Sequence, residues 1–332
     1  MPERQTSAVT GAETRFTRLV GCDLPIQQAP IGLPAATPAL AAAVAAAGAH
    51  GMLAAVTVAP AALSTSLDVL NARTRAYGVN FIQELLDPEA FEVAAAKAPL
   101  VELYLGPAHP HLVDRAHRHG ALVSRQVVSV DEARSAQDEG CDMVVVRGIE
   151  AGGRSITGIG LLALLDAVCD AVDIAVVAAG GIGSARGVSA CLAAGADAVR
   201  VGTRFLAAAE ADTHPVYREQ LIAAGPHDTV LTDEFSAGIP RSNARVLRSC
   251  LAAARAYEGD VVGEMTVGGV RVQAPRFGPH NPALDAAGHV EAMALYAGQG
   301  VGSVRRVEPA ADIVAELALG VRGHVGTAGG VA

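Results

Sequence analysis

Residues 174–205 read IAVVAAGGIGSARGVSACLAAGADAVRVGTRF. This stretch holds two short apolar runs, 174–177 and 196–201, and each run is followed by a glycine turn and by the start of a helix. Short apolar runs that are bounded by glycines are typical of buried strands. Ser184 lies where it can cap the helix between them. The stretch therefore predicts two parallel strands whose turns meet at the same end of a sheet.

The two turns contain Gly180 and Gly181 in the first case and Gly202 and Thr203 in the second. Backbone N–H groups at the start of a helix are unpaired, and the helix dipole favours a negative charge there. In (β/α)₈ barrels the loops after the last two strands commonly bind a phosphate in this way. The stretch thus favours a barrel with a phosphate site at these four residues. The alternative is that the glycines only permit tight turns.

Length and composition allow a large core and argue against several classes of partner. The chain has 332 residues, of which 51% are hydrophobic, and this is enough for one barrel with an additional small domain. A net charge of −9 and an aromatic content of 3% argue against a nucleic-acid partner. Five cysteines without CxxC spacing, and no basic and apolar leader, predict a cytoplasmic protein with reduced thiols. No apolar run has the length that a membrane span requires, so no membrane partner is expected.

The chain before residue 174 repeats the alternation of strand and helix. Six further strands are predicted at 24–31, 52–56, 76–82, 100–105, 121–127 and 142–147. Eight strands that alternate with helices predict an α/β fold, the (β/α)₈ TIM barrel. An open doubly wound sheet is the alternative, but it would require GxGxxG after the first strand, where this sequence has APIG.

The alternation stops after residue 209. Residues 210–282 mix short strand-like pieces with a predicted helix over 243–257, and we expect them to form a small lid domain over the carboxyl ends of the strands. Two closing helices are predicted over 284–296 and 310–319. The expected division is therefore a barrel of residues 1–209 and 283–332 and a lid of residues 210–282.

The predicted carboxyl ends of the strands carry amide and guanidinium groups. Asn80, Gln126 and Arg147 lie at three of these ends, and His109 follows the fourth strand. No cluster of His, Asp and Glu has the spacing of metal ligands, and no GxSxG motif is present, so neither a metal site nor a hydrolase nucleophile is expected. Together with the phosphate turns, these residues favour a phosphorylated organic cofactor across the mouth of the barrel.

Six motifs in order along the chain resemble those of the FMN-dependent nitronate monooxygenases. They are QAPIG at 28–32, GVN at 78–80, GIEAGGRS at 148–155, AAGGIGSARG at 178–187, GADAVRVGTRFL at 195–206 and LYAGQGVG at 295–302. Relatives of that family include FMN-dependent enoyl reductases and some NAD(P)H:quinone reductases. The resemblance implies an FMN barrel with a smaller lid. It assigns Ala29, Gly32, Asn80 and Gln126 to the isoalloxazine or ribityl chain, Gly152 and Gly153 to the phosphate region, Gly180, Gly181, Gly202 and Thr203 to the phosphate itself, and Gln299 and Gly300 to the cover over the flavin.

Two positions depart from the family pattern. The family loop usually reads GxEAGGH, and its histidine acts as a catalytic base or contacts the substrate, whereas this chain has Arg154. The position before the loop is usually glutamine and is here Arg147. Arginine stays protonated and cannot abstract a proton, but it binds a carboxylate or nitronate through two hydrogen bonds. His109 is a candidate replacement for the missing histidine.

These residues favour a small anionic, nitronate-like substrate that is oxidised with O₂ at flavin N5. Since a nitronate is already deprotonated, its oxidation needs no base, and activity on neutral nitroalkanes is expected to be lost. One alternative is that Arg154 is a solvent-exposed loop residue in a chain that has drifted from nitronate oxidation. Another is an NAD(P)H-dependent FMN reductase that acts on a quinone or an enoyl substrate, and a third is a divergent biosynthetic flavoenzyme. The sequence leaves a homodimer open.

Overall fold

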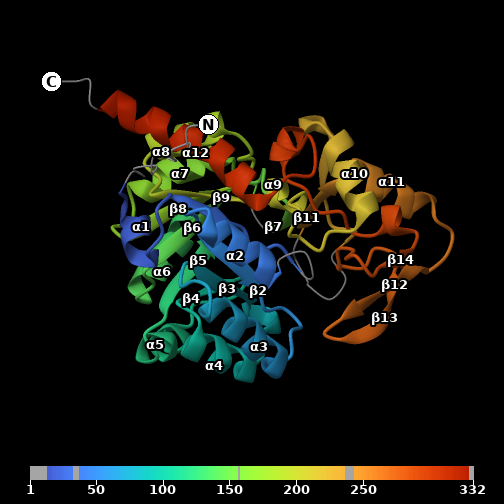
Figure 1. Cartoon of the computed structure of the whole chain (residues 1–332), viewed down its shortest axis with the longest axis horizontal. Helices are drawn as coiled ribbons and strands as arrows, with labels where there is room; N and C mark the ends of the chain where they lie inside the picture. Colours follow the sequence, from blue (N-terminus) through green and yellow to red (C-terminus); the bar gives the residue numbers. More distant parts are fainter. Residues whose placement is uncertain (1–12, 33–36, 156–157, 236–242, 329–332) are drawn as a thin grey trace, which may run out of the picture.

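The computed structural model describes residues 13–32, 37–155, 158–235 and 243–328. Within them, eight parallel strands follow one another around a barrel in the order β1-β9-β8-β6-β5-β4-β3-β2 (Figure 1). The strands are β1 (Ile26–Gln28), β2 (Gly51–Ala54), β3 (Tyr77–Ile82), β4 (Leu100–Tyr104), β5 (Leu122–Val127), β6 (Met143–Arg147), β8 (Ala175–Ala179) and β9 (Ala198–Val201).

The barrel closes between β1 and β2 through the backbone. The Gln28 N–H donates to the His50 carbonyl at 2.9 Å, and the His50 N–H donates to the Ile26 carbonyl at 2.9 Å. The predicted (β/α)₈ barrel is therefore confirmed.

Helices alternate with the strands, as the apolar periodicity predicts. They are α2 (Pro38–Ala46), α3 (Pro60–Asn71), α4 (Pro88–Lys97), α5 (Pro110–Arg118), α6 (Val130–Asp138), α7 (Leu161–Cys169), α8 (Ala185–Ala193) and the single turn α9 (Thr203–Leu206). Ser184 caps α8, as its position in the sequence predicts: its hydroxyl accepts a hydrogen bond from the Gly187 N–H at 3.3 Å. Among the described helices, none combines the length and hydropathy that a bilayer crossing requires.

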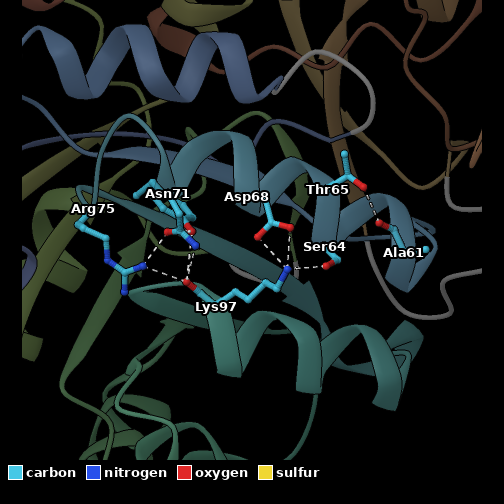
Figure 2. Close-up of polar contacts among 8 residues, drawn as sticks. Ala61, Ser64, Thr65, Asp68, Asn71, Arg75 and Lys97 are labelled. Atoms are coloured by element: carbon cyan, nitrogen blue, oxygen red, sulfur yellow. Dashed lines mark hydrogen bonds and ion pairs between the residues drawn. The ribbon is translucent and has the colours of Figure 1, made fainter.

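A lysine joins two neighbouring outer helices (Figure 2). Lys97, the last residue of α4, places its Nζ 2.8 Å from the Asp68 carboxylate and 2.7 Å from the Ser64 hydroxyl, both on α3. The Lys97 carbonyl, which the end of α4 leaves unpaired, accepts from Asn71 and Arg75 at 3.1 Å each. The partners of Lys97 thus fix α3 against α4.

The barrel interior has an apolar lower part and a polar upper part. Below, Met52, Leu100, Met143 and Val177 pack against Phe16 of α1 (Arg15–Val20), which covers the amino ends of the strands. Alternate residues of the same strands point inward, so Leu100, Glu102 and Tyr104 of β4 belong to successive layers. The polar layers lead to the carboxyl ends of the strands.

A smaller unit lies beside the barrel (Figure 1). It contains α10 (Pro215–Ala223), β10 (Thr229–Thr232), β11 (Asn243–Leu247), α11 (Arg248–Ala256), β12 (Val261–Val267), β13 (Val270–Pro275) and β14 (Ala287–Gly288). Its hydrophobic cluster includes residues from Leu206 to Val304, past the expected boundary at 282. A last helix, α12 (Ala310–Ala328), returns to the barrel and packs on α8, where the Ser189 hydroxyl donates to the Gly320 carbonyl at 2.6 Å.

Two helix predictions need correction. The predicted helix over 243–257 begins only at Arg248, because residues 243–247 form β11, the central strand of a sheet with β10 and with β7 (Gly153–Ser155). The predicted helix over 284–296 is wrong: Gly288 has a φ of +103°, which no helix accommodates, and β14 pairs there with β12. The predicted helix over 310–319 is confirmed as part of α12.

Candidate active site

A cavity of about 460 Å³ lies at the carboxyl ends of the barrel strands, between the barrel and the smaller unit. Every barrel strand contributes to its wall through its last residues or the loop that follows. The smaller unit contributes a segment at 279–281 and a second one around Tyr296 and Gly298.

Most residues that the sequence assigned to the site line this cavity. They are Ala29, Gly32, Asn80, Gln126, Arg147, Gly152, Gly153, Arg154, Gly180, Gly181, Gly202, Thr203 and Gly300. Two assigned residues do not line it.

His109 is the first of these two. It lies at the N-cap of α5, where its N–H donates to the Glu139 carboxylate at 2.9 Å and its ring packs edge-on against His111. The strand before it ends at Tyr104, whose side chain already reaches the cavity, and the chain then turns outward. His109 therefore lies outside the cavity that Arg154 lines, and nothing in the described structure supports it as a replacement for the loop histidine.

Gln299 is the second, and its side chain is exposed. Its N–H donates to the Glu150 carbonyl at 2.9 Å, and the neighbouring Gly298 N–H donates to the Thr203 hydroxyl at 3.0 Å. These bonds hold the segment over the turn after β9. The glycines on either side of Gln299, and not its amide, face the cavity.

The glycine turns after β8 and β9 both line the cavity, and each lies at the start of a helix. Gly180 has a φ of +127° and Gly181 a φ of +68°, conformations that favour glycine. A Cβ on Gly180 would lie 3.2 Å from the backbone nitrogen of Ala151, and one on Gly202 would lie 3.3 Å from the Ala29 methyl group. Glycine thus permits the close packing of these turns against their neighbours, and because the turns line the cavity beside the start of α8, they fit a phosphorylated cofactor.

Beneath the floor of the cavity lies a buried carboxylate whose donors line the cavity, and sequence reasoning missed this carboxylate. The Glu102 side chain is fully buried. One of its oxygens accepts from Asn80 Nδ2 at 2.9 Å, from Gln126 Nε2 at 2.7 Å and from Arg200 Nη1 at 2.8 Å. The other accepts from the Ser124 hydroxyl at 3.1 Å and from Arg200 Nη2. The available signal was a pair of opposite charges in the middle of two apolar strands, LVELY and AVRV, because buried charges require partners.

A second buried chain of polar groups continues below Arg200. Its Nε donates to Gln27 Oε1 at 2.7 Å, and the Gln27 amide nitrogen lies 3.1 Å from His50 Nδ1. His50 Nε2 is buried and has no hydrogen-bond partner among the described residues. Burial, together with the Arg200 charge, lowers the pKa of His50 to about 3. His50 is therefore neutral at physiological pH.

Arg147 presents a guanidinium group to the cavity wall. It lies over the Tyr104 ring, 5.5 Å from the ring centre, and its Nη2 donates to the Gly152 carbonyl at 2.5 Å. Its Nε is buried and has no partner within the described part of the chain. Glu150 does not pair with it, since both Glu150 oxygens accept from the Leu161 N–H at the start of α7, at 3.0 Å each. Arg147 thus keeps hydrogen-bonding capacity for an anion.

Arg154 is a buried strand residue, so the alternative of a solvent-exposed loop residue is wrong. It is 9% exposed, and it pairs in β7 with Ala244 of β11. Its Nη2 donates to the Phe235 carbonyl at 3.3 Å, and its own carbonyl accepts from the Tyr104 hydroxyl at 3.1 Å. Pairing with the smaller unit therefore holds Arg154 at the cavity.

His280 is a histidine of the cavity wall that sequence reasoning missed. Its loop is held on both sides, because the Tyr296 hydroxyl donates to the Pro279 carbonyl at 2.6 Å and Asn281 Nδ2 donates to the Gly32 carbonyl at 3.3 Å. Burial and then the Arg154 charge hold the pKa of His280 below its ordinary value. Its only signal in the sequence is a histidine in a proline-rich turn, and that pattern does not indicate where the turn lies.

The barrel, the cavity at the carboxyl ends of its strands and the glycine turns after its last two strands are features of barrel proteins that bind a phosphorylated ligand at this end. The family model described as nitronate monooxygenase matches residues 71–320. The chain therefore belongs to the nitronate monooxygenase family, whose members are flavoproteins that act on small molecules.

Individual relatives agree with this assignment. The chain is 32% identical over 253 residues, 75% of its length, to "(3aS,4S,5R,7aS)-5-hydroxy-7a-methyl-1-oxo-octahydro-1H-indene-4-carboxyl-CoA dehydrogenase" of Rhodococcus jostii, and the match covers 70% of that protein. Among solved structures, FabK from Thermotoga maritima matches 96% of this chain and 99% of its own, with a TM-score of 0.76 and 28% identity. Nitroalkane oxidase from Streptomyces ansochromogenes matches 95% of this chain and 100% of its own, with a TM-score of 0.73 and 28% identity. The chain spans 33% to 70% of the length of the first curated relatives that it matches.

Proposed function

We propose that this oxidoreductase binds FMN in the cavity and oxidises a small organic anion of the nitronate type, with O₂ as the final electron acceptor. The observation that carries the proposal is Arg147. Its charged side chain lies on the cavity wall with a buried Nε that lacks a partner in the described part of the chain, and no carboxylate of that part forms an ion pair with it. A partly buried cation of this kind favours an anionic ligand, because a charged donor without a partner is costly.

The residues of the cavity fit FMN as follows. Backbone groups of Gly180, Gly181, Gly202 and Thr203 would hold the phosphate, with Gly152 and Gly153 near it. Side chains and backbone at Ala29, Gly32, Asn80 and Gln126 would lie along the ribityl chain and the ring, and Gly300 would cover it. When bound, FMN supplies the acceptor for the two electrons that leave the substrate.

The protein's own contribution is to bind and orient the substrate. Arg147 and Arg154 would hold the two oxygens of a nitronate through charged hydrogen bonds. Neither arginine can accept a proton. His280 is the candidate acceptor on this wall, but its lowered pKa makes it a weak base. The site is therefore suited to a substrate that arrives already deprotonated.

Three preparations test this proposal. The purified protein is examined for FMN by its visible absorbance and then mixed without oxygen with ethylnitronate, with nitroethane or with NADPH. We expect the nitronate to bleach the flavin fastest, and readmission of O₂ to restore the colour. A colourless protein that binds no added FMN would contradict the cofactor assignment, and a flavin bleached by NADPH alone would contradict the oxidase assignment.

A reductase is the second candidate. It is favoured by the identity to a dehydrogenase named for a carboxyl-CoA compound, over three quarters of this chain. In that case the cavity arginines would serve NAD(P)H or an anionic thioester substrate, and a quinone or an enoyl compound would reoxidise the flavin. The anaerobic experiment separates the two candidates, because only a reductase is bleached by the pyridine nucleotide.

A further inference from the structure

We propose that Glu102 is a positioning residue that sets the charge and the orientation of the cavity floor, and through them the affinity and reduction potential of the bound flavin. The inference rests on the proposed function in one respect, namely that the cofactor is FMN.

Glu102 connects three strands under the cavity. Its donors Asn80, Gln126 and Arg200 come from β3, β5 and β9, and all three also line the cavity. Glu102 itself does not line it. It therefore acts on a ligand only through the groups that it holds.

The carboxylate also decides which atoms of the two amides remain for a ligand. An ionised carboxylate only accepts hydrogen bonds, so Asn80 and Gln126 must turn their NH₂ groups towards Glu102. Their carbonyl oxygens are then the atoms left to meet the cavity. Two fixed acceptors suit the ring N–H groups of a heterocycle such as the isoalloxazine.

The second effect is on charge. Glu102 and Arg200 form an ion pair in which the side chains are 0% and 3% exposed, so water screens neither charge. Reduction adds negative charge to a flavin, and a nearby positive charge favours the reduced form. In the intact pair, Glu102 offsets the Arg200 charge. A neutral glutamine in place of Glu102 would leave the positive charge of Arg200 without an opposite charge beneath the cofactor.

The chain offers a matched control. Arg125 and Glu139 form another buried ion pair, with side chains 7% and 6% exposed, and Arg125 is on β5 between two residues that bind Glu102. Because neighbouring residues of a strand point to opposite faces, Arg125 lies outside the barrel, and neither member of the pair lines the cavity. Glu139→Gln therefore breaks the same type of pair without changing the floor.

The experiment compares Glu102→Gln, Arg200→Gln and Glu139→Gln with the unchanged protein, each loaded with FMN. The dissociation constant of FMN is measured by fluorescence and the midpoint potential by spectroelectrochemistry. We expect Glu102→Gln to raise the affinity for reduced FMN, relative to that for oxidised FMN, by at least about tenfold compared with the unchanged protein. For a two-electron couple this raises the midpoint potential by about 30 mV. We expect Arg200→Gln to shift the potential downwards and Glu139→Gln to leave it unchanged.

The outcomes separate this inference from the proposed function. If the unchanged protein binds no FMN, the cofactor assignment fails and the inference fails with it. If FMN binds but Glu102→Gln has the same potential as Glu139→Gln, the inference alone is wrong. If Glu102→Gln does not fold, the inference is tested by the expected downward shift of the midpoint potential in Arg200→Gln. Glu102→Asp keeps the charge, so it should keep the midpoint potential while it weakens FMN binding.

Discussion

Under the proposed function, Arg154 would select the ionic form of a nitro substrate that the cavity can use. Replacing it by alanine removes a charged hydrogen bond, which is worth about 1.5–3 kcal/mol, so kcat/KM for a nitronate should fall about 10- to 100-fold. Arg154→His restores the loop histidine of the family and should raise the turnover of neutral nitroalkane relative to nitronate. Steady-state rates with ethylnitronate and nitroethane, each corrected for spontaneous ionisation, measure both effects.

Arg154→Lys is the control for charge. It keeps a cation in the strand but loses the planar pair of donors, so it should retain more nitronate activity than the alanine variant and gain none with nitroethane. Equal use of nitroethane and ethylnitronate by the unchanged protein would contradict the assigned role of the arginine.

The sequence predicts residues that line the cavity well where they belong to a local motif. Gly180 and Gly202 follow strands that are recognisable from their own composition, so their position at one end of the sheet follows from the topology. His280 and Glu102 lie in no such motif. Their roles depend on which side chains the fold brings within a few ångströms. Residues far away in the chain decide that, such as Arg200, which is 98 positions from Glu102.

At the scale of elements, the same distinction separates the barrel from the smaller unit. Each barrel strand is a buried apolar run beside its helix, and all eight are predicted within a few residues of their bounds. Residues 153–155 read as a glycine loop, yet they form β7, because β11, about 90 residues later, supplies its partner. Pairing over such a separation leaves no local trace in the sequence.

The turn after β8 provides a prediction at this scale. Gly180→Ala places a methyl group 3.2 Å from the Ala151 nitrogen in a conformation with φ of +127°, so the turn must shift. We expect a loss of about 1–2 kcal/mol in the free energy of unfolding and at least a tenfold rise in the FMN dissociation constant. Chemical denaturation and fluorescence titration with FMN measure the two quantities.

Gly120 supplies the control for that variant. Its φ is +81°, but an added Cβ would meet nothing within 4 Å. Gly120→Ala should therefore lose similar stability and keep its FMN affinity. If both variants bound FMN like the unchanged protein, the turn after β8 would not be part of the cofactor site.

At the scale of the whole molecule, function and stability meet inside the barrel. The upper layers are polar because they face the cavity, whereas the lower layers are apolar and are covered by α1. His50 lies between the two, fully buried, with the Phe16 ring edge-on at 5.7 Å and the Arg200 charge above it. Protonation at this position would add a second buried positive charge beneath the cavity, so the folded barrel favours the neutral imidazole.

The stability of the molecule should consequently depend on pH through His50. Its pKa falls from 6.5 in the unfolded chain to about 3 in the folded one. Above pH 6.5 neither state binds the proton, whereas between 6.5 and 3 only the unfolded state does, so stability falls with falling pH by up to about 1.4 kcal/mol per unit. From pH 7 to pH 4.5 His50 should contribute a loss of roughly 2–3 kcal/mol. Urea denaturation of His50→Gln, which keeps an amide beside Gln27 but binds no proton, should show a pH slope shallower by that amount. The exposed His111→Gln should keep the full slope, and equal slopes in all three proteins would mean that His50 is not held neutral by the fold.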